Sequence, residues 1–453
     1  MNSILQLKGR FEQRSNRSRP GSPKLPKGKS VSASHLRELE KQLERILVYW
    51  TENKDIRGAL VSVHYKHIVA KSNRLKILLS ENGKSPTESI RGAKFVWEPD
   101  QKGNEVQKHV FTHFVSLQAI EKSIDVLKKT ASIIEQYYKG SVPSEVIEEL
   151  GEKYHFNEVP KTSFLKTVVD GFYVERFDID RATEEITEEA IITIYQTGVD
   201  TKRLLSKFGI DIVDDRIIDG TTLRLNPDEV KLLYNNASYL IAMGVTDFSE
   251  ISRDDVLDAY EDMEEEAGLL IPHPQNEPVI GVIDTQFNEK VYFHEWVEYK
   301  NLLDPNIPLS RKDYEHGTAV SYIIVDGPQG NPELADGCGR FRVRHFGVAT
   351  NNGFSSFTVL KMIRNIVASN RDIKVWNLSL GSKLEIKPNF ISPEAAELDR
   401  IQSEYDVIFV VAGTNIPAGV TKKNMRIGSP ADSLNSMVVN AVDFAGNSAS
   451  YTR

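Results

Sequence analysis

Cysteine and long apolar runs are scarce in this sequence, and each scarcity excludes a class of protein. Cys338 is the only cysteine among the 453 residues, so the chain can form no internal disulfide and no thiolate zinc site. We expect this single thiol to be a small core residue. No run of about eighteen apolar residues occurs, and residues 1–33 have no apolar block of the kind found in secretion signals. We therefore expect no membrane span and interpret the chain as cytoplasmic.

Two motifs of common enzyme classes are also missing. Neither His-Glu-x-x-His nor Gly-x-x-x-x-Gly-Lys occurs, which argues against the usual zinc-protease and phosphate-loop enzymes. We expect no cofactor and no metal. The net charge of -8 disfavours a general role in nucleic-acid binding, and a composition of 40% hydrophobic and 26% charged residues is typical of a globular chain with two or three domains.

Composition and periodicity divide the first 277 residues into four parts. Residues 1–34 form a basic tail rich in Ser, Pro and Gly, which we expect to be disordered. Residues 35–178 predict an N-terminal α+β module, with a helix from Leu36 to about Trp50, three strands and a long amphipathic helix after Leu117. Residues 179–245 form a second module. An acidic linker is expected at residues 246–277.

His109 and His113 lie four residues apart in the N-terminal module. They share one face whether the segment is a helix or, as its apolar neighbours favour, a strand. Because no carboxylate pattern accompanies them, we interpret both as structural rather than as metal ligands.

The second module, residues 179–245, has the order strand, helix, strand, strand, helix, strand. Its second helix should begin at Asn226-Pro227, since Asn can cap a helix and Pro fits the first helical position. The four strands are predicted at 190–195, 210–213, 221–225 and 239–243, and the first helix at 201–207.

Residues 278–453 predict an α/β fold with a mostly parallel sheet, because helices fall between apolar strands. A helix is expected at Ser356–Ser369. The strands are predicted at Val279–Ile283, Val343–Val348, Lys374–Leu380, Val407–Val411 and Met437–Val442.

Two phrases in this region carry side chains suited to acid–base chemistry. The strand that starts at Val279 ends on Asp284, and His316 is followed by Gly317 and Thr318. A histidine can take the proton of a weak hydroxyl nucleophile, while a carboxylate holds the imidazole in one tautomer. Each residue alone is unspecific, since an Asp after a strand is more often a turn or cap residue.

Together, in this order and 32 residues apart, the two phrases resemble the Asp and His motifs of the subtilisin-like serine proteases. Downstream, residues 377–381 are similar to the family's substrate-binding strand. Residues 410–415 are similar to the segment with its oxyanion asparagine, although Thr414 intervenes between Gly413 and Asn415. The resemblance implies a subtilisin-like sheet with flanking helices, the catalytic residues Asp284, His316 and Asn415, and a peptide-binding backbone at Ser379, Leu380 and Gly381.

The resemblance also implies a nucleophilic serine in a Gly-Thr-Ser phrase, and none of the Gly-Thr pairs here is followed by Ser. We therefore expect a serine-type endopeptidase that is truncated before its nucleophile and inactive as given. The module at residues 179–245 is similar to the ferredoxin-like prodomains that precede such catalytic domains and block their cleft. The alternatives are an unrelated α+β module and, for the whole chain, a pseudoprotease or scaffold that binds a peptide or protein without catalysis.

Overall fold

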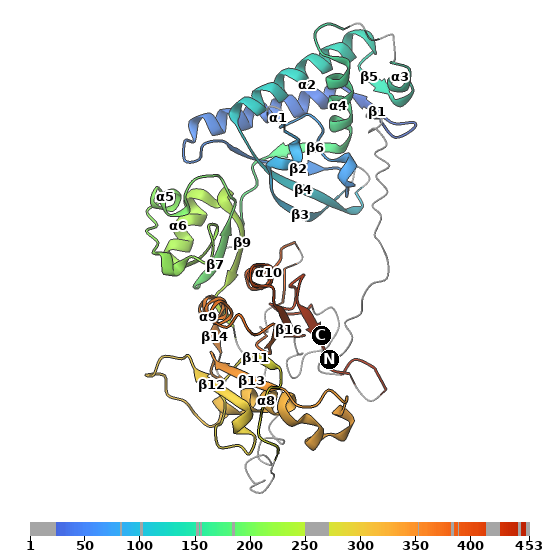
Figure 1. The fold of residues 1–453 in the computed structure, drawn as a ribbon. Coiled ribbons are helices and arrows are strands. Elements are labelled where there is room, and N and C mark those ends of the chain that lie inside the picture. The colour runs from blue at the N-terminus through green and yellow to red at the C-terminus, as the bar shows by residue number, and fades with distance from the viewer. Residues whose placement is uncertain are drawn as a thin grey trace. The chain divides into compact units, whose positions relative to one another are not determined.

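The computed structural model describes residues 24–81, 84–99, 103–150, 154, 156–183, 186–249, 271–351, 353–381, 385–387, 389–413, 426–442 and 445–449. The chain divides into two compact units (Figure 1). The first comprises residues 1–54, 58–90 and 96–179, and the second comprises residues 55–57, 91–95 and 180–453. Among the described residues, no helix combines the length and the apolar character needed to cross a membrane.

The first unit contains a four-stranded sheet and two long helices, and the two helices lie side by side (Figure 1). Ser32 caps the first helix, and Leu36, Leu39 and Leu43 form its fully buried stripe, as the sequence predicted. The helices are α1 (Ala33–Glu52), α2 (Leu117–Tyr137), α3 (Ser144–Glu149) and α4 (Lys161–Tyr173). The sheet has the order β3 (Ile90–Pro99), β4 (Glu105–Val115), β2 (Ala59–Tyr65) and β6 (Val174–Asp178), and residues 91–95 of β3 are assigned to the second unit.

Ordered structure begins before the boundary predicted at residue 34. Strand β1 (Ser30–Ser32) pairs in antiparallel fashion with β5 (Ser141–Pro143). Leu25 and Val31 are buried, so this end of the predicted tail supplies apolar side chains to the first unit. The rest of the predicted tail, residues 1–23, lies outside the described residues.

The second module of the sequence forms a three-stranded antiparallel sheet at the start of the second unit. Its elements are β7 (Ala190–Ile194), α5 (Thr201–Ser206), β8 (Thr222–Leu225), α6 (Pro227–Ala237) and β9 (Ile241–Thr246), and the strand order is β8-β7-β9. Asn226 caps α6, and Glu229 completes a capping box, which confirms the predicted helix start.

The strand predicted at residues 210–213 is wrong. Ile210 and Ile212 are buried with the alternation expected of a strand, but the segment forms no strand and enters a 3-10 turn at Asp214–Arg216. Side chains in this segment therefore alternate between buried and exposed positions although its backbone does not pair with another strand. The four-stranded ferredoxin-like arrangement is not present among the described residues of this module.

The C-terminal region contains a six-stranded parallel sheet, as predicted. Its order is β12 (Val297–Asn301), β13 (Arg342–Gly347), β11 (Val279–Asp284), β15 (Val375–Leu378), β16 (Ile408–Ala412) and β17 (Met437–Val439). All five predicted strands are present, and β12 was missed because its polar sequence VEYKN has no apolar run. This strand lies at an edge of the sheet, where only a few apolar side chains are needed.

Helices cover both faces of this sheet. Helices α9 (Ser356–Ser369) and α10 (Pro393–Tyr405) pack on one face around Trp376, and α8 (Lys312–Gly330) packs on the other around Val282. Gly281 lies beside the Trp376 ring, and a Cβ atom there would come within 2.2 Å of it. This close approach positions β11, which ends in Asp284, at the centre of the sheet.

Two aspartates contact helices of the C-terminal region within the second unit, Asp219 in the module at residues 179–245 and Asp247 just after it. Asp247 accepts hydrogen bonds from Phe357 N at 2.9 Å and from Ser355 Oγ at 2.8 Å, at the start of α9. Asp219 accepts from Arg400 of α10 at 2.7 Å. In addition, β10 (Phe248–Ser249) pairs with β14 (Phe354–Ser355).

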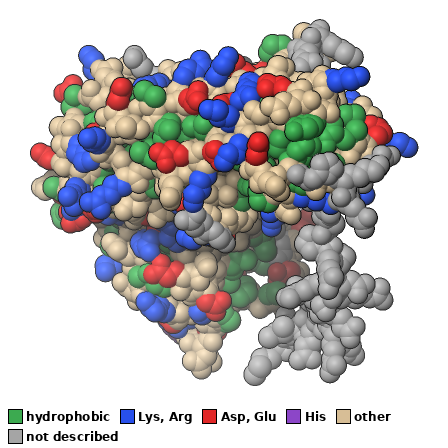
Figure 2. Space-filling model, turned by 90° about the horizontal axis from the view of Figure 1, so that it is seen from above, with side chains coloured by type: hydrophobic (Ala, Val, Ile, Leu, Met, Phe, Trp, Pro, Cys, Tyr) green, Lys and Arg blue, Asp and Glu red, His purple; other side chains and the backbone are tan. Residues whose placement is uncertain are grey.

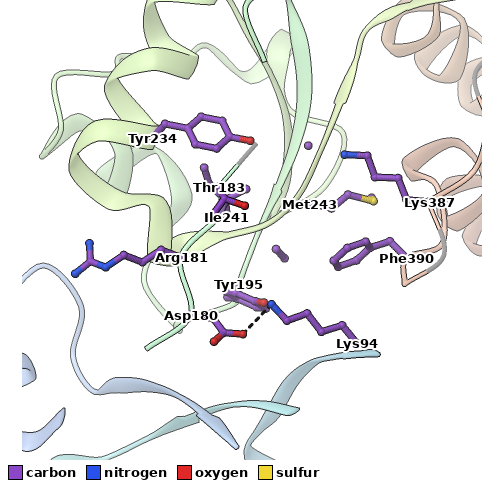
Figure 3. Close-up of a pocket in the computed structure, with 13 residues that line it drawn as sticks. Lys94, Asp180, Arg181, Thr183, Tyr195, Tyr234, Ile241, Met243, Lys387 and Phe390 are labelled. Atoms are coloured by element: carbon purple, nitrogen blue, oxygen red, sulfur yellow. Dashed lines mark ion pairs between the residues drawn. The ribbon is translucent and has the colours of Figure 1, made fainter. Parts of the chain in front are cut away.

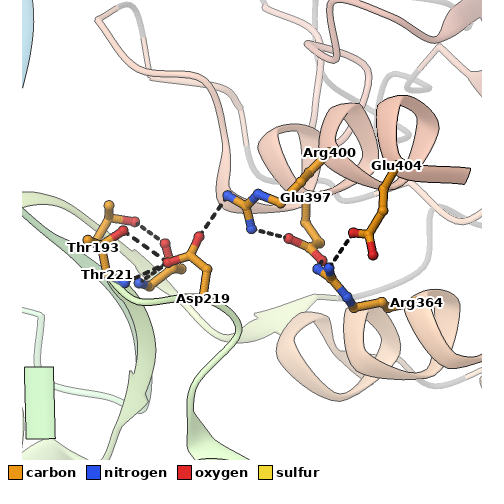
Figure 4. A network of polar contacts seen from close by, with 8 residues as sticks. Thr193, Asp219, Thr221, Arg364, Glu397, Arg400 and Glu404 are labelled. Atoms are coloured by element: carbon orange, nitrogen blue, oxygen red, sulfur yellow. Dashed lines mark hydrogen bonds and ion pairs between the residues drawn. The ribbon is translucent and has the colours of Figure 1, made fainter. Parts of the chain in front are cut away.

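A chain of ion pairs continues from Asp219 through both helices (Figure 4). Arg400 also pairs with Glu397, whose side chain is almost fully buried, and Glu397 pairs in turn with Arg364 of α9. Arg364 then reaches Glu404 at 2.6 Å. Two arginines thus pair with one buried carboxylate, and one of them connects it to the module at residues 179–245.

Two further expectations concern Cys338 and the acidic linker. Cys338 is exposed rather than part of the core, because it lies in a turn between Gly337 and Gly339, both of which have φ near +78°. Most of the acidic linker, residues 250–270, lies outside the described residues and stays a prediction. On the face shown in Figure 2, Lys and Arg side chains are scattered among Asp and Glu.

Candidate active site

Asp284 is the last residue of β11 and its side chain is completely buried. The carboxylate Oδ1 accepts hydrogen bonds from Thr285 N and from His316 Nδ1, both at 2.6 Å. Its Oδ2 is buried and has no hydrogen-bond partner among the described residues. The orientation of this carboxylate therefore depends on the two donors to Oδ1.

His316 lies in the first turns of α8, and about a fifth of its side chain is exposed. The contact from Nδ1 to Asp284 leaves Nε2 on the opposite side of the ring, as expected of a general base held by a carboxylate. The structure thus brings together the two residues that the sequence singled out, although they are 32 positions apart.

Gly317 explains how α8 can approach β11 so closely. A Cβ atom on this residue would lie 2.6 Å from Gln286 O, 2.8 Å from Thr285 O and 2.8 Å from His345 Cε1. The Gly317 N–H donates to Thr285 Oγ1 at 2.9 Å. Any larger side chain would push the helix, and His316 with it, away from Asp284.

His345 is a buried residue of this site that sequence reasoning missed. It lies on β13, and its Nε2–H donates to Thr285 O at 2.8 Å, while Ser321 Oγ lies 3.0 Å from Nδ1. The only signal in the sequence was a histidine within the predicted strand Val343–Val348. A histidine in an apolar strand does not by itself reveal which residues it contacts.

The site favours an ionised carboxylate beside neutral His345. Burial alone would raise the pKa of Asp284, but the charge and the hydrogen bond of His316 hold this pKa below its ordinary value. Burial lowers the pKa of His345, and this exceeds the opposing effect of its bond to the Thr285 carbonyl. The carboxylate can therefore stabilise a positive charge that develops on His316.

The predicted peptide-binding residues follow β15 at the same edge of the sheet. Leu378 pairs with Ile283, so Ser379 follows beside Asp284. Ser379 Oγ donates to Asn377 Oδ1 at 2.9 Å, and Leu380 is buried in the core under α9 and α10. Asn415 lies outside the described residues, and the description stops two positions before it, at Gly413.

An apolar hollow of about 570 Å³ lies on the face of the sheet that α8 covers only in part. Ile280, Val375 and Val410 contribute from the sheet, and Ile323 contributes from α8. The hollow therefore begins about two helical turns after His316.

A second pocket of about 220 Å³ lies elsewhere in the second unit (Figure 3). Tyr195, Tyr234 and Lys387 line it, together with an ion pair of 2.7 Å between Lys94 and Asp180. None of the predicted site residues lines this pocket, and we assign it no part in the chemistry. Throughout the described ranges, no group of three or more His, Cys, Asp or Glu side chains could hold a metal ion.

The C-terminal region thus has parallel strands, flanking helices and an Asp–His pair at the carboxyl end of a central strand. Residues 275–453 match the family model described as the Subtilase family. This region therefore has the sequence pattern of that family. A comparison with curated proteins found no match.

Solved structures with a detectable likeness are distant. The epidermin leader peptide processing serine protease from Staphylococcus aureus is 16% identical, covers 58% of this chain and 72% of its own, and has a TM-score of 0.35. The prenylagaramide maturation protease PagA is 13% identical over 44% of this chain and 63% of its own, with a TM-score of 0.29. The subtilisin-like protease Apa1 from Pseudoalteromonas sp. AS-11 is 18% identical, and the match covers 39% of this chain and 38% of Apa1, with a TM-score of 0.29.

Proposed function

We propose that residues 275–453 carry the acid–base half of a serine-type endopeptidase site, with His316 as the general base and Asp284 as its orienting carboxylate. The observation that supports this most directly is the 2.6 Å hydrogen bond from His316 Nδ1 to the buried Asp284 Oδ1. Its place at the end of a central parallel strand, inside a subtilase-family domain, gives the pair its chemical context.

In the proposed reaction, His316 Nε2 takes the proton of a serine hydroxyl as its oxygen attacks the carbonyl of the scissile peptide bond. Asp284 holds the imidazole tautomer and stabilises the imidazolium, which then protonates the leaving amine. Asn415 would donate to the developing oxyanion, a contribution of roughly 3 to 4 kcal/mol to the barrier. Ser379, Leu380 and Gly381 would pair with the backbone of an extended protein or peptide substrate.

We propose further that the nucleophile is not among the serines of this sequence. Two serines of this region have other partners, since Ser321 contacts His345 Nδ1 and Ser379 donates to Asn377. No Gly-Thr-Ser phrase occurs. A segment that carries such a serine would pack in the apolar hollow beside α8, where burial contributes about 25 cal/mol per Å².

A fluorophosphonate probe, which labels only an activated serine, tests both parts of this proposal. The 453-residue chain should not be labelled. A chain lengthened at its C-terminus with the Gly-Thr-Ser segment of a subtilase-family domain should be labelled, and His316→Ala should abolish that labelling. Asp284→Asn should slow it about 10⁴-fold, because the imidazole would hold the wrong tautomer.

Two results would contradict the proposal in different ways. Labelling of the 453-residue chain that disappears in His316→Ala would identify a nucleophile among its own serines. Labelling of the lengthened chain that persists in His316→Ala would show that His316 is not the base.

We also propose that the module at residues 179–245 acts as an intramolecular, prodomain-type partner that restrains the catalytic region. This proposal is supported by the ion pair between Asp219 and Arg400 of α10, and by Asp247, which follows the module directly and accepts a hydrogen bond from Phe357 N at the start of α9. Both helices lie under the sheet that bears Asp284, so the module would stabilise the scaffold of the site.

A double-mutant cycle in the full chain tests this docking. Asp219 also accepts hydrogen bonds from Thr221 N and Thr222 N, and Asp219→Asn keeps an oxygen that can accept them. Asp219→Asn and Arg400→Gln alone should each increase hydrogen exchange in the turn around Thr221, and the double variant should increase it little further. The coupling should be about 0.5 to 1 kcal/mol, because both side chains are partly exposed. Exchange rates that simply add in the double variant would show that the pair does not hold the module.

A further inference from the structure

Thr285 is held on both sides of its backbone by elements of the site. Its N–H donates to Asp284 Oδ1 at 2.6 Å. The following peptide group, between Thr285 and Gln286, accepts from His345 Nε2 at 2.8 Å through its carbonyl and donates to Asp313 O at 2.8 Å through its N–H. Because Asp313 lies in α8, this peptide group joins β11, β13 and the helix that carries His316.

His345 can act here in only one tautomer. A carbonyl oxygen accepts but never donates, so Nε2 must carry the proton that reaches Thr285 O. Nδ1 of the neutral ring then accepts from the Ser321 hydroxyl at 3.0 Å. The titratable groups that act on this ring are Asp284 and His316, and burial keeps the pKa of His345 below its ordinary value. Neutral His345 therefore has both of its nitrogens engaged.

The Asp284 carboxylate has few other constraints. Oδ2 has no hydrogen-bond partner among the described residues, so Thr285 N–H is the one donor besides His316 that acts on this side chain. If the Thr285 backbone turns, the carboxylate turns with it. The angle at which Asp284 meets His316 therefore depends on what fixes Thr285.

We propose that His345, acting through Thr285, is a positioning residue that keeps the Asp284 carboxylate aligned with His316. Its ring also contacts the helix directly, because His345 Cε1 would lie 2.8 Å from a Cβ atom on Gly317. Ser321 fixes the ring from the same helix. The role rests on the proposed function, in which His316 and Asp284 are the base and its orienting carboxylate.

The test uses the full chain with ¹⁵N-labelled histidine and needs no nucleophile. A proton shared between His316 Nδ1 and a buried carboxylate should give a resonance at unusually low field, and Asp284→Asn should remove it. We expect His345→Phe to remove it too, because the released Thr285 no longer holds the carboxylate. His345→Gln should restore it, since the amide N–H of glutamine can donate to Thr285 O.

A matched control separates positioning from general destabilisation. His113 in the first unit is also buried and bonded to a serine, with Ser89 Oγ 2.8 Å from its Nδ1. His113→Phe should lower the thermal stability of the chain and leave the low-field resonance unchanged. Ser321→Ala gives a milder variant of the site, in which His345 keeps its bond to Thr285 and the resonance should broaden without vanishing.

The outcomes distinguish this proposal from the function on which it rests. A resonance that is present in the unmodified chain and unchanged in His345→Phe would overturn the positioning role alone. Equal loss in His345→Phe and His113→Phe would overturn it as well, because the effect would then be a general loss of structure. Absence of the resonance from the unmodified chain would contradict the Asp284–His316 pair, and the positioning role with it.

Discussion

Asp170 of the first unit and Asp284 of the second are both buried aspartates, and they are held in different ways. Asp170, on α4 of the first unit, accepts hydrogen bonds from three successive backbone N–H groups, those of Lys76, Ile77 and Leu78, at 2.8 to 3.0 Å. Asp284, in the second unit, accepts from one backbone N–H and one imidazole.

The pKa values of the two aspartates move in opposite directions. Burial raises the pKa of Asp170 to about 6, even though its three amide donors favour the ionised form. Burial also acts on Asp284, but His316 holds that pKa below its ordinary value. For Asp170 the three amide donors do not outweigh burial, whereas for Asp284 the charge and the hydrogen bond of His316 do.

The largest effect that separates the two regions is expected from Asp170→Ala. One buried and two partly buried N–H groups would lose their acceptor, and the free energy that protects residues 76–78 against opening should fall by about 4 kcal/mol. Native-state hydrogen exchange of these amides measures the loss. Asp125→Ala, at an exposed position on α2, provides the control and should change protection by less than about 0.5 kcal/mol. Equal protection in the two variants would show that Asp170 does not hold this loop.

The pH dependence of stability should also differ in sign between the two regions. The folded pKa of Asp170, about 6, lies above its ordinary value of 3.8, so its contribution is fully present below about pH 3.8 and is lost as the pH rises through 6. The difference of about two units between the folded pKa of Asp170 and its ordinary pKa corresponds to about 3 kcal/mol in the free energy of unfolding. The folded pKa of Asp284 is lowered, so its contribution is present above pH 3.8 and is lost as the pH falls.

Hydrogen exchange between pH 4 and 7 tests the slope expected of Asp170, because the contribution of Asp284 changes only below about pH 3.8. Protection around residues 76–78 should fall with rising pH in the unmodified chain and become flat in Asp170→Asn, which does not titrate. A flat profile in both would mean that the three amides, rather than burial, determine the ionisation of Asp170.

The sequence could predict the helices and strands that bury a continuous apolar face. The apolar periodicity of α1, α2, β11, β15 and β16 specified those elements, because each buries a continuous apolar face. Strand β12 was not predicted, because a strand at the edge of a sheet needs few apolar side chains. The strand at residues 210–213 was predicted wrongly, because buried and exposed side chains alternate there without strand pairing.

The candidate site was predictable to the extent that it follows from local phrases. Asp284 and His316 were found because each stands in a recognisable motif, and the structure joins them. The links through Thr285 and His345 could not be found in this way. They depend on the register of β13 against β11, which pairs Ile283 with Phe346 and Asp284 with Gly347, and no local pattern specifies that register.

The smallest of these effects is expected from Gly317→Ala, which tests the close packing in the site itself. The added Cβ would lie 2.6 Å from Gln286 O and 2.8 Å from both Thr285 O and His345 Cε1, two backbone oxygens and a buried ring that cannot easily move. We expect a loss of about 2 kcal/mol in the free energy of unfolding of the second unit, measured with urea, because the helix must shift outward. Gly220→Ala is the matched control, since nothing lies within 4 Å of a Cβ atom there, and it should change stability by less than about 0.5 kcal/mol. Equal losses in the two variants would show that α8 can move away from β11 without strain, and the alignment of His316 with Asp284 would then not depend on the glycine that follows it.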